Sequence, residues 1–400
     1  GFRRLAQFST ICVPWIFVIF FAGALSVLPQ LTASSPQVGS IGSLDDLWRL
    51  AEERIWIGRQ DSAFSLWHGA GFAWMCNLAF HLGLSDMALL RYAPRASYGL
   101  FSACGMYLGH FLVWMASGVM GAGAALLLKT SLSSLDPGEV AHQALGLGGA
   151  LCVIFSGWAT SNPTLYRAGL ALQVITPGWP RWLVTLLAGT VTVIIACFPF
   201  IFQYLLQFVG VFAILMAPVA AVVFVEHWVF PRIGLRRFWF GDSQRVVNWA
   251  ALAAWAITVV ACFALWRSEL LHVVFIAVPG WLLAAVSYTA FAAVAGARGA
   301  ASRDPRPFEP ESAPLPAPAA SLAHERAANS SRSALDIWSG VIGISSLALC
   351  LALALWVGLA GEEGDGHNLA AFKTYLAVAS VVHLCAAATW VLHSEQTERE

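Results

Sequence analysis

The sequence predicts an all-α protein that crosses a lipid bilayer several times, and three observations point to this class. First, 58% of the 400 residues are hydrophobic and only 11% are charged, whereas soluble domains carry about 25% charged residues. Second, the apolar residues form runs of roughly 20 residues, the length that spans a hydrocarbon layer about 30 Å thick. Third, the Lys and Arg residues gather on alternate sides of these runs.

Ten predicted spans account for most of the chain. Two of them exceed the length of one crossing, so we expect them to tilt or to break at their glycines; these are 98–128 and 143–171. The ten spans cover approximately residues 10–29, 64–86, 98–128, 143–171, 181–200, 203–230, 246–266, 270–296, 336–360 and 369–393.

The positive residues orient these spans. With the N-terminus in the cytoplasm and the spans alternating, sixteen of the 22 Lys and Arg residues fall on the inner side and six on the outer side. An excess of Lys and Arg in cytoplasmic loops is the usual pattern of membrane proteins. Reversing the chain or omitting one span removes the asymmetry, so the number of spans and their orientation support each other.

Two segments lie outside the predicted spans. The outer loop 31–63 carries a charged stretch, 45–54, whose spacing suits a short surface helix. Residues 297–334 are rich in Pro, Ala and Ser, which predicts a disordered cytoplasmic linker. The linker divides a core, 1–296, from an appended helix pair, 335–394, which we expect to stand outside the working core. Since the chain starts at Gly1 without a signal peptide, we interpret it as lacking its beginning.

The composition excludes several classes of function. A net charge of zero without a basic stripe excludes a nucleic-acid-binding protein. The eight cysteines stand singly in apolar runs, and the ten histidines form no HxxxH or HExxH pair, so no metal-site motif is present. No catalytic constellation is visible. We therefore predict no enzyme, no cofactor and no metal site, with the lipid bilayer as a partner.

The most informative stretch is 155–173, with the sequence FSGWATSNPTLYRAGLALQ. Ser156, Ala159, Thr160 and Pro163 share one helical face. Because Pro163 cannot donate to the carbonyl four residues earlier, the Ala159 oxygen loses its partner. That oxygen, with Thr160 and Ser156, is suitable for Na⁺, a hard cation that takes oxygen ligands. In the alternative, the hydroxyls bond to their own helix or to a neighbouring one.

A second polar stripe on the same helix consists of Asn162, Tyr166 and Gln173, spaced i, i+4 and i+11. Polar groups at membrane depth normally face a bundle interior or a water-filled cavity. The two stripes together therefore predict that this helix lines a solute pathway.

The span 64–86 combines three glycines with polar and aromatic side chains. Gly-interrupted spans that carry polar residues such as Asn77, His81 and Asp86 are typical of transporter binding sites. Trp74 and Phe80 offer aromatic faces that can stack on a flat heterocycle. In the alternative, Trp74 belongs to an interfacial belt, the glycines permit close packing, and His81 is a hydrogen-bonded bundle residue.

These stretches resemble a known family. The segment 158–173 resembles the eighth helix of the nucleobase–cation symporters of the purine–cytosine permease type. The run 208–235, FVGVFAILMAPVAAVVFVEHWVFPRIGL, is similar to their tenth helix, and the second span with Asp86 and Arg91-Tyr92 to their sixth. The resemblance covers roughly residues 1–296 and is most specific over 155–232.

The resemblance implies a LeuT-type inverted-repeat fold, with this chain holding the family's helices five to twelve and lacking the first four. It implies a secondary active symporter of the plasma membrane, driven by Na⁺ or H⁺. The substrate would be a small heterocycle such as cytosine, a purine, uracil, allantoin or hydantoin. Two alternatives stay open: a LeuT-type carrier of another solute class such as amino acids, and a membrane protein that senses or catalyses without transport.

The resemblance also implies site residues. Ala159 and Thr160 match the cation-binding positions of the eighth helix, with Ser156 one turn earlier, and the stretch from Asn162 to Tyr166 matches the neighbourhood that faces the nucleobase. Two departures concern the sixth helix: Asn77 stands where the family has a tryptophan, and the spacing from Asp86 to Arg91 is stretched. The substrate-binding residues predicted overall are Trp74, Asn77, Phe80, His81, Asn162 and Tyr166.

Overall fold

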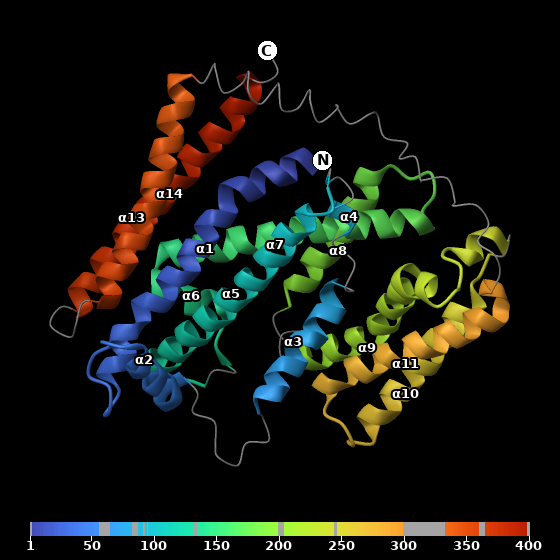
Figure 1. The fold of residues 1–400 in the computed structure, drawn as a ribbon. Helices are drawn as coiled ribbons and strands as arrows, with labels where there is room; N and C mark the ends of the chain where they lie inside the picture. The colour runs from blue at the N-terminus through green and yellow to red at the C-terminus, as the bar shows by residue number, and fades with distance from the viewer. Residues whose placement is uncertain are drawn as a thin grey trace. The chain divides into compact units, whose positions relative to one another are not determined.

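The computed structural model describes residues 2–55, 65–81, 87–90, 93, 95–131, 134–198, 204–243, 246–298, 333–359 and 365–397. Over these ranges the chain is helical, apart from connecting turns and one isolated antiparallel bridge between Leu235 and Arg298. The chain forms two compact units (Figure 1). Unit 1 comprises residues 1–59, 93–185 and 314–400, and unit 2 comprises residues 60–92 and 186–313.

The predicted membrane class is confirmed. Seven helical segments in the described ranges are long and apolar enough to cross a bilayer, which makes the chain a multi-pass membrane protein. The seven segments are Arg4–Ala33, Tyr98–Leu128, Leu205–Arg232, Trp249–Arg267, Val273–Ala297, Ala334–Gly358 and Asn368–Ser394.

The three remaining predicted spans are also helical. They correspond to α3 (Leu66–His81), α7 (Leu147–Ile175) and α8 (Arg181–Ala196). Helices α3 and α8 have 16 residues each, and α7, with 29 residues, carries a polar run that lowers its hydropathy. The total of ten spans therefore stays a prediction.

Helix α1 (Phe2–Ala33) organises unit 1. It packs against α5 (Tyr98–Leu128), α6 (Pro137–Leu145), α7, α13 (Ala334–Leu359) and α14 (Asp365–Thr397). Trp15 and Ile19 of α1 are fully buried in one core with Cys350 of α13 and with Phe372 and Leu376 of α14. The apolar stripe of α1 thus joins segments from both ends of the chain.

The C-terminal helix pair is part of this core. In Figure 1, α13 and α14 run side by side, and both contact α1. The interpretation of 335–394 as an appendage was based on the linker that precedes it. A linker sequence gives no information on whether the helices after it pack against α1. Residues 299–332 of the predicted linker lie outside the described residues, and the domain boundaries stay predictions.

Glycines set the spacing of helices in unit 1. The predicted span 143–171 breaks at Gly146, whose φ of 59° favours glycine, so that α6 ends there and α7 begins. The long span 98–128, in contrast, is one unbroken helix. A Cβ added at Gly123 of α5 would lie 2.9 Å from the Cβ of Val27 on α1, so a small residue is needed for this close contact.

The outer loop contains the short helix that its charges predicted. Helix α2 (Leu44–Leu50) is capped by Ser43. The Ser43 hydroxyl accepts a hydrogen bond from the Asp46 N–H and donates one to the Asp46 carboxylate at 2.8 Å. This hydroxyl hydrogen bond lowers the pKa of Asp46. The π-helical turn η1 (Ala51–Ile55) follows. Leu50 and Val38 are buried in the core of unit 1, which holds the described part of the loop against the helices.

Unit 2 is built on α9 (Leu205–Phe224), which packs against α3, α10 (Trp249–Arg267) and α11 (Val273–Ala292). Its core includes Met75 of α3, Ala213 of α9 and Val274 of α11. The remaining described elements are α4 (Met87–Leu90), the π-helical turns η4 (Val225–Val229) and η7 (Ala293–Ala297), and the 3₁₀ turns η5 (Phe230–Arg232) and η6 (Trp239–Ser243).

The first prediction concerns the contact between α6 and α7. A Cβ at Gly149 would overlap the Ala141 carbonyl group of α6, and this backbone neighbour can move away only if the two helices separate. We expect Gly149→Ala to destabilise the protein by about 1–3 kcal/mol. The readout is the apparent Tm of the purified protein, followed by tryptophan fluorescence.

Gly157→Ala is the matched control on the same helix, because an added Cβ there meets no atom within 4 Å. Alanine favours helix over glycine by up to about 1 kcal/mol, so this variant should be as stable as the original or more stable. Equal Tm values for the two variants would contradict the packing described here.

Candidate functional site

The hydroxyl groups of α7 bond to their own helix. Thr160 Oγ1 donates to the Ser156 carbonyl oxygen at 2.9 Å, and Thr164 Oγ1 donates to the Thr160 carbonyl oxygen at 2.9 Å. Ser156 Oγ donates in the same way to the Val153 carbonyl at 3.2 Å. This is the alternative that the sequence left open. A hydroxyl that donates its proton keeps its lone pairs, so the predicted cation site stays a prediction.

Helix α7 continues through Pro163 without a break. Thr160 is exposed within unit 1, and Ser156 and Ala159 are half-buried. The three predicted cation-binding residues therefore lie together on a regular helix, and unit 1 does not fully cover them.

The second polar stripe has two different environments. Asn162 is half-buried, and its side-chain amide makes no hydrogen bond to any part of the chain that the structure describes. Tyr166, also half-buried, has the guanidinium carbon of Arg181 5.0 Å from its ring centroid, a cation–π contact with the start of α8. Asn162 is thus the predicted substrate-binding residue of α7 whose polar group remains available.

Aromatic rings fix this part of α7 against α1. The ring centroids of Phe8 and Trp158 are 4.7 Å apart, and Trp15 meets Phe155 edge-on at 5.8 Å. Trp15 is completely buried. The polar run of α7 is therefore flanked by ring contacts that pack it against α1.

Helix α3 has one packed face and one open face. Met75, Leu78 and Ala79 are buried, whereas Trp74 and Phe80 are 61% and 49% exposed. Asn77 also lies on the open side, and its amide donates to the Ala73 carbonyl at 2.9 Å.

The predicted residues of α3 therefore lie on one side of unit 2, and those of α7 belong to unit 1. His81, at the end of α3, is half-buried. Gly83, Asp86 and Arg91 lie outside the described residues, so the predicted helix break at this point stays a prediction.

Two polar networks were not found by sequence reasoning. In unit 2 the hydroxyl group of Tyr288, fully buried on α11, donates to Glu226 Oε2 and accepts from Trp239 Nε1 at 3.3 Å. In the sequence, Glu226 stands at the end of the predicted span 203–230, where we interpret it as an interfacial residue, and within the run that resembles the tenth helix. No local pattern links it to a tyrosine 62 residues further on.

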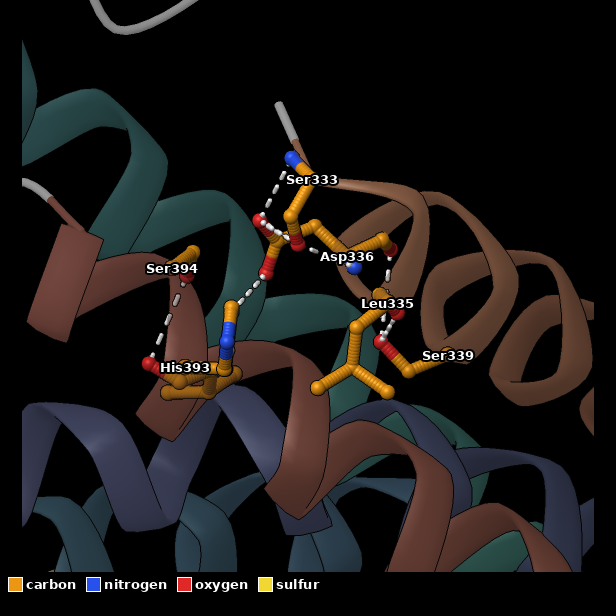
Figure 2. A network of polar contacts seen from close by, with 7 residues as sticks. Ser333, Leu335, Asp336, Ser339, His393 and Ser394 are labelled. Carbon is orange, nitrogen blue, oxygen red and sulfur yellow. Dashed lines mark hydrogen bonds and ion pairs between the residues drawn. The ribbon is translucent and has the colours of Figure 1, made fainter. Parts of the chain in front are cut away.

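The second network closes one end of the α13–α14 pair in unit 1 (Figure 2). Asp336, 4% exposed, accepts from Ser333 N at 3.2 Å, from Ser333 Oγ at 2.9 Å and from His393 Nδ1 at 2.9 Å. Ser333 and Asp336 form a capping box at the start of α13, and this spacing is a signal that the sequence did offer. The histidine ties the last turns of α14 to that cap.

Comparison with known proteins returns no match to a protein-family model, to a curated protein or to a solved structure. The likeness of residues 155–232 to nucleobase–cation symporters therefore stays a sequence interpretation. Within the described ranges, no three His, Cys, Asp or Glu side chains are grouped so as to hold a metal ion.

The Asp336–His393 contact gives the second prediction. His393→Ala leaves a buried carboxylate with one partner fewer, and we expect a loss of roughly 1–3 kcal/mol. His393→Gln, which keeps an N–H donor, should restore part of that loss. The readout is again the apparent Tm, with Thr389→Ala as the control because its hydroxyl bonds only to its own helix. A His393→Ala variant as stable as the control would refute a stabilising role.

The third prediction concerns water at the polar face of α7. After replacement of the exposed Cys104, Cys197 and Cys385 by serine, Thr160→Cys should react with a charged thiol reagent, since thiolates form only in water. Val260→Cys is the control, at an apolar position of α10 that is 69% exposed; it should react at least tenfold more slowly. Equal rates, measured by mass spectrometry in membranes, would place Thr160 in lipid.

Proposed function

We propose that this multi-pass membrane protein is a secondary active symporter of the plasma membrane that carries a nucleobase-like heterocycle together with Na⁺ or H⁺. One observation carries the proposal: the middle of α7 bears a hydroxyl and amide run that unit 1 leaves partly open. Thr160 is exposed there, and the Asn162 amide has no partner in the described chain.

In a bilayer, the side-chain amide of Asn162 is energetically unfavourable unless a polar group hydrogen-bonds to it. An amide moved into an apolar medium without a hydrogen bond loses roughly 1–3 kcal/mol by protein mutational data and more by transfer to hydrocarbon. Lipid chains supply no donor or acceptor. A solute or a water-filled pathway beside Asn162 removes this penalty, and intramembrane polar residues usually mark such pathways.

The proposal assigns separate roles to the two polar helices. On α7, Ser156, Ala159 and Thr160 bind the coupling cation through oxygen atoms. Asn162 bonds to the polar edge of the substrate, and Tyr166 borders the same region.

On α3, the exposed rings of Trp74 and Phe80 are suited to stack on a planar heterocycle, with Asn77 and His81 as polar neighbours. The LeuT-type inverted-repeat architecture belongs to this proposal. Coupling means that each ligand raises the affinity of the other by the same factor.

The fourth prediction tests transport directly. In proteoliposomes containing the full-length protein, an imposed cation gradient should drive uptake of at least one compound among cytosine, uracil, hypoxanthine, allantoin and hydantoin. Amino acids should not compete. Thr160→Ala should raise the cation concentration for half-maximal uptake at least tenfold, equivalent to about 1.4 kcal/mol, and Thr160→Ser should restore most of the loss.

Thr192→Ala is the matched control, because its hydroxyl makes the same bond to the carbonyl four residues earlier, on α8. It should leave cation dependence unchanged. Uptake of amino acids instead of heterocycles would favour the other carrier class. Binding of a heterocycle without counterflow would favour a sensor, and an equal response of the two alanine variants would remove the cation site from α7.

A further inference from the structure

Unit 2 contains a pocket of about 680 Å³ where α9 continues into η4 and α11 into η7. Its walls are mainly apolar, and Arg298 is the charged residue among those that line it. The volume lies in the range of roughly 300–1,000 Å³ typical of small-ligand sites. The apolar wall residues include Phe224, Val229, Trp281, Val286 and Ala290.

The charged end of the pocket is fixed by backbone contacts. Leu235, which lines the pocket, forms the isolated bridge with Arg298. The Arg236 N–H donates to the Ala297 carbonyl at 3.0 Å, and the Arg236 guanidinium donates to the Gly296 carbonyl at 3.2 Å. The turn 232–237 is thereby held beside residues 296–298, which brings its arginines to the same end of the pocket.

Two arginines at this end have no acidic partner in the described ranges. Arg237 and Arg298 are exposed and make no ion pair with any residue in the described ranges. Glu226 lies one residue after the pocket-lining Val225, but its carboxylate accepts the hydrogen bond of the buried Tyr288 and does not line the pocket. Among the side chains that the structure describes, the rim therefore presents net positive charge above apolar walls.

We infer that this pocket binds an anionic phospholipid, with an acyl chain along the apolar walls and the phosphate on Arg298 and the turn 232–237. A guanidinium pairs with phosphate through parallel hydrogen bonds. In the predicted orientation this end faces the cytoplasm, and the cytoplasmic leaflet carries the anionic lipids. A free phosphate would leave the apolar walls empty. The inference does not depend on the proposed transport.

The fifth prediction uses the full chain, purified in a neutral detergent. Added phosphatidylglycerol should raise the apparent Tm, because a ligand that binds only the folded state stabilises it. Phosphatidylcholine with the same acyl chains should raise it much less. Arg298→Gln should weaken the phosphatidylglycerol effect about tenfold in apparent affinity, and Ala290→Trp, which fills the pocket, should abolish it.

Arg267→Gln is the control, since Arg267 is an exposed arginine at the far end of α10 in the same unit; it should respond like the original protein. Equal stabilisation by the two lipids, or by glycerophosphate without acyl chains, would overturn the inference, as would equal losses for Arg298→Gln and Arg267→Gln. A photoactivatable phosphatidylglycerol provides a check on the unaltered protein. It should label the peptides around Val286 and Ala290, and labelling confined to other helices would also overturn the inference.

Discussion

A hydrocarbon layer offers no hydrogen bonds, and this constraint accounts for the placement of most polar groups described in this chain. The hydroxyls of α7 donate to carbonyls of their own helix. The buried carboxylate of Asp336 accepts three hydrogen bonds, and Glu226 is paired with a buried tyrosine. The amide of Asn162 and the guanidinium of Arg298 are among the polar groups without a partner in the described ranges, and we propose a ligand for each.

Much of the fold could be predicted from the sequence because it depends on local properties. Apolar runs of sufficient length are helical, the charged stretch in the outer loop forms α2, and Gly146 separates α6 from α7. The position of α13 and α14 was not predictable in this way. Their apolar runs are visible in the sequence, but no local pattern shows which helix packs against them. Here that helix is α1, more than 300 residues earlier in the chain.

The candidate site was predictable to a similar extent. On α3 the residue types of Trp74 and Asn77 were visible, but the sequence did not show which side of the helix packs against its neighbours. On α7 the residue types were visible but their partners were not, because serine and threonine can bond either to their own helix or to a ligand. The contacts of Asp336 with His393 and of Glu226 with Tyr288 join residues 57 and 62 positions apart, and no spacing rule reaches that far.

Asn162 and Arg298 are suited to different ligands because they lie at different positions along their helices. Asn162 has at least 13 residues of α7 on either side, or about 20 Å of helix at 1.5 Å per residue, so it lies near the middle of its helix. Arg298 follows the last turn of η7, where a long cationic side chain extends to the interface and meets phosphate. A small polar solute can satisfy the first group and a lipid headgroup the second. Position along the helix therefore separates the proposed transport site from the proposed lipid site.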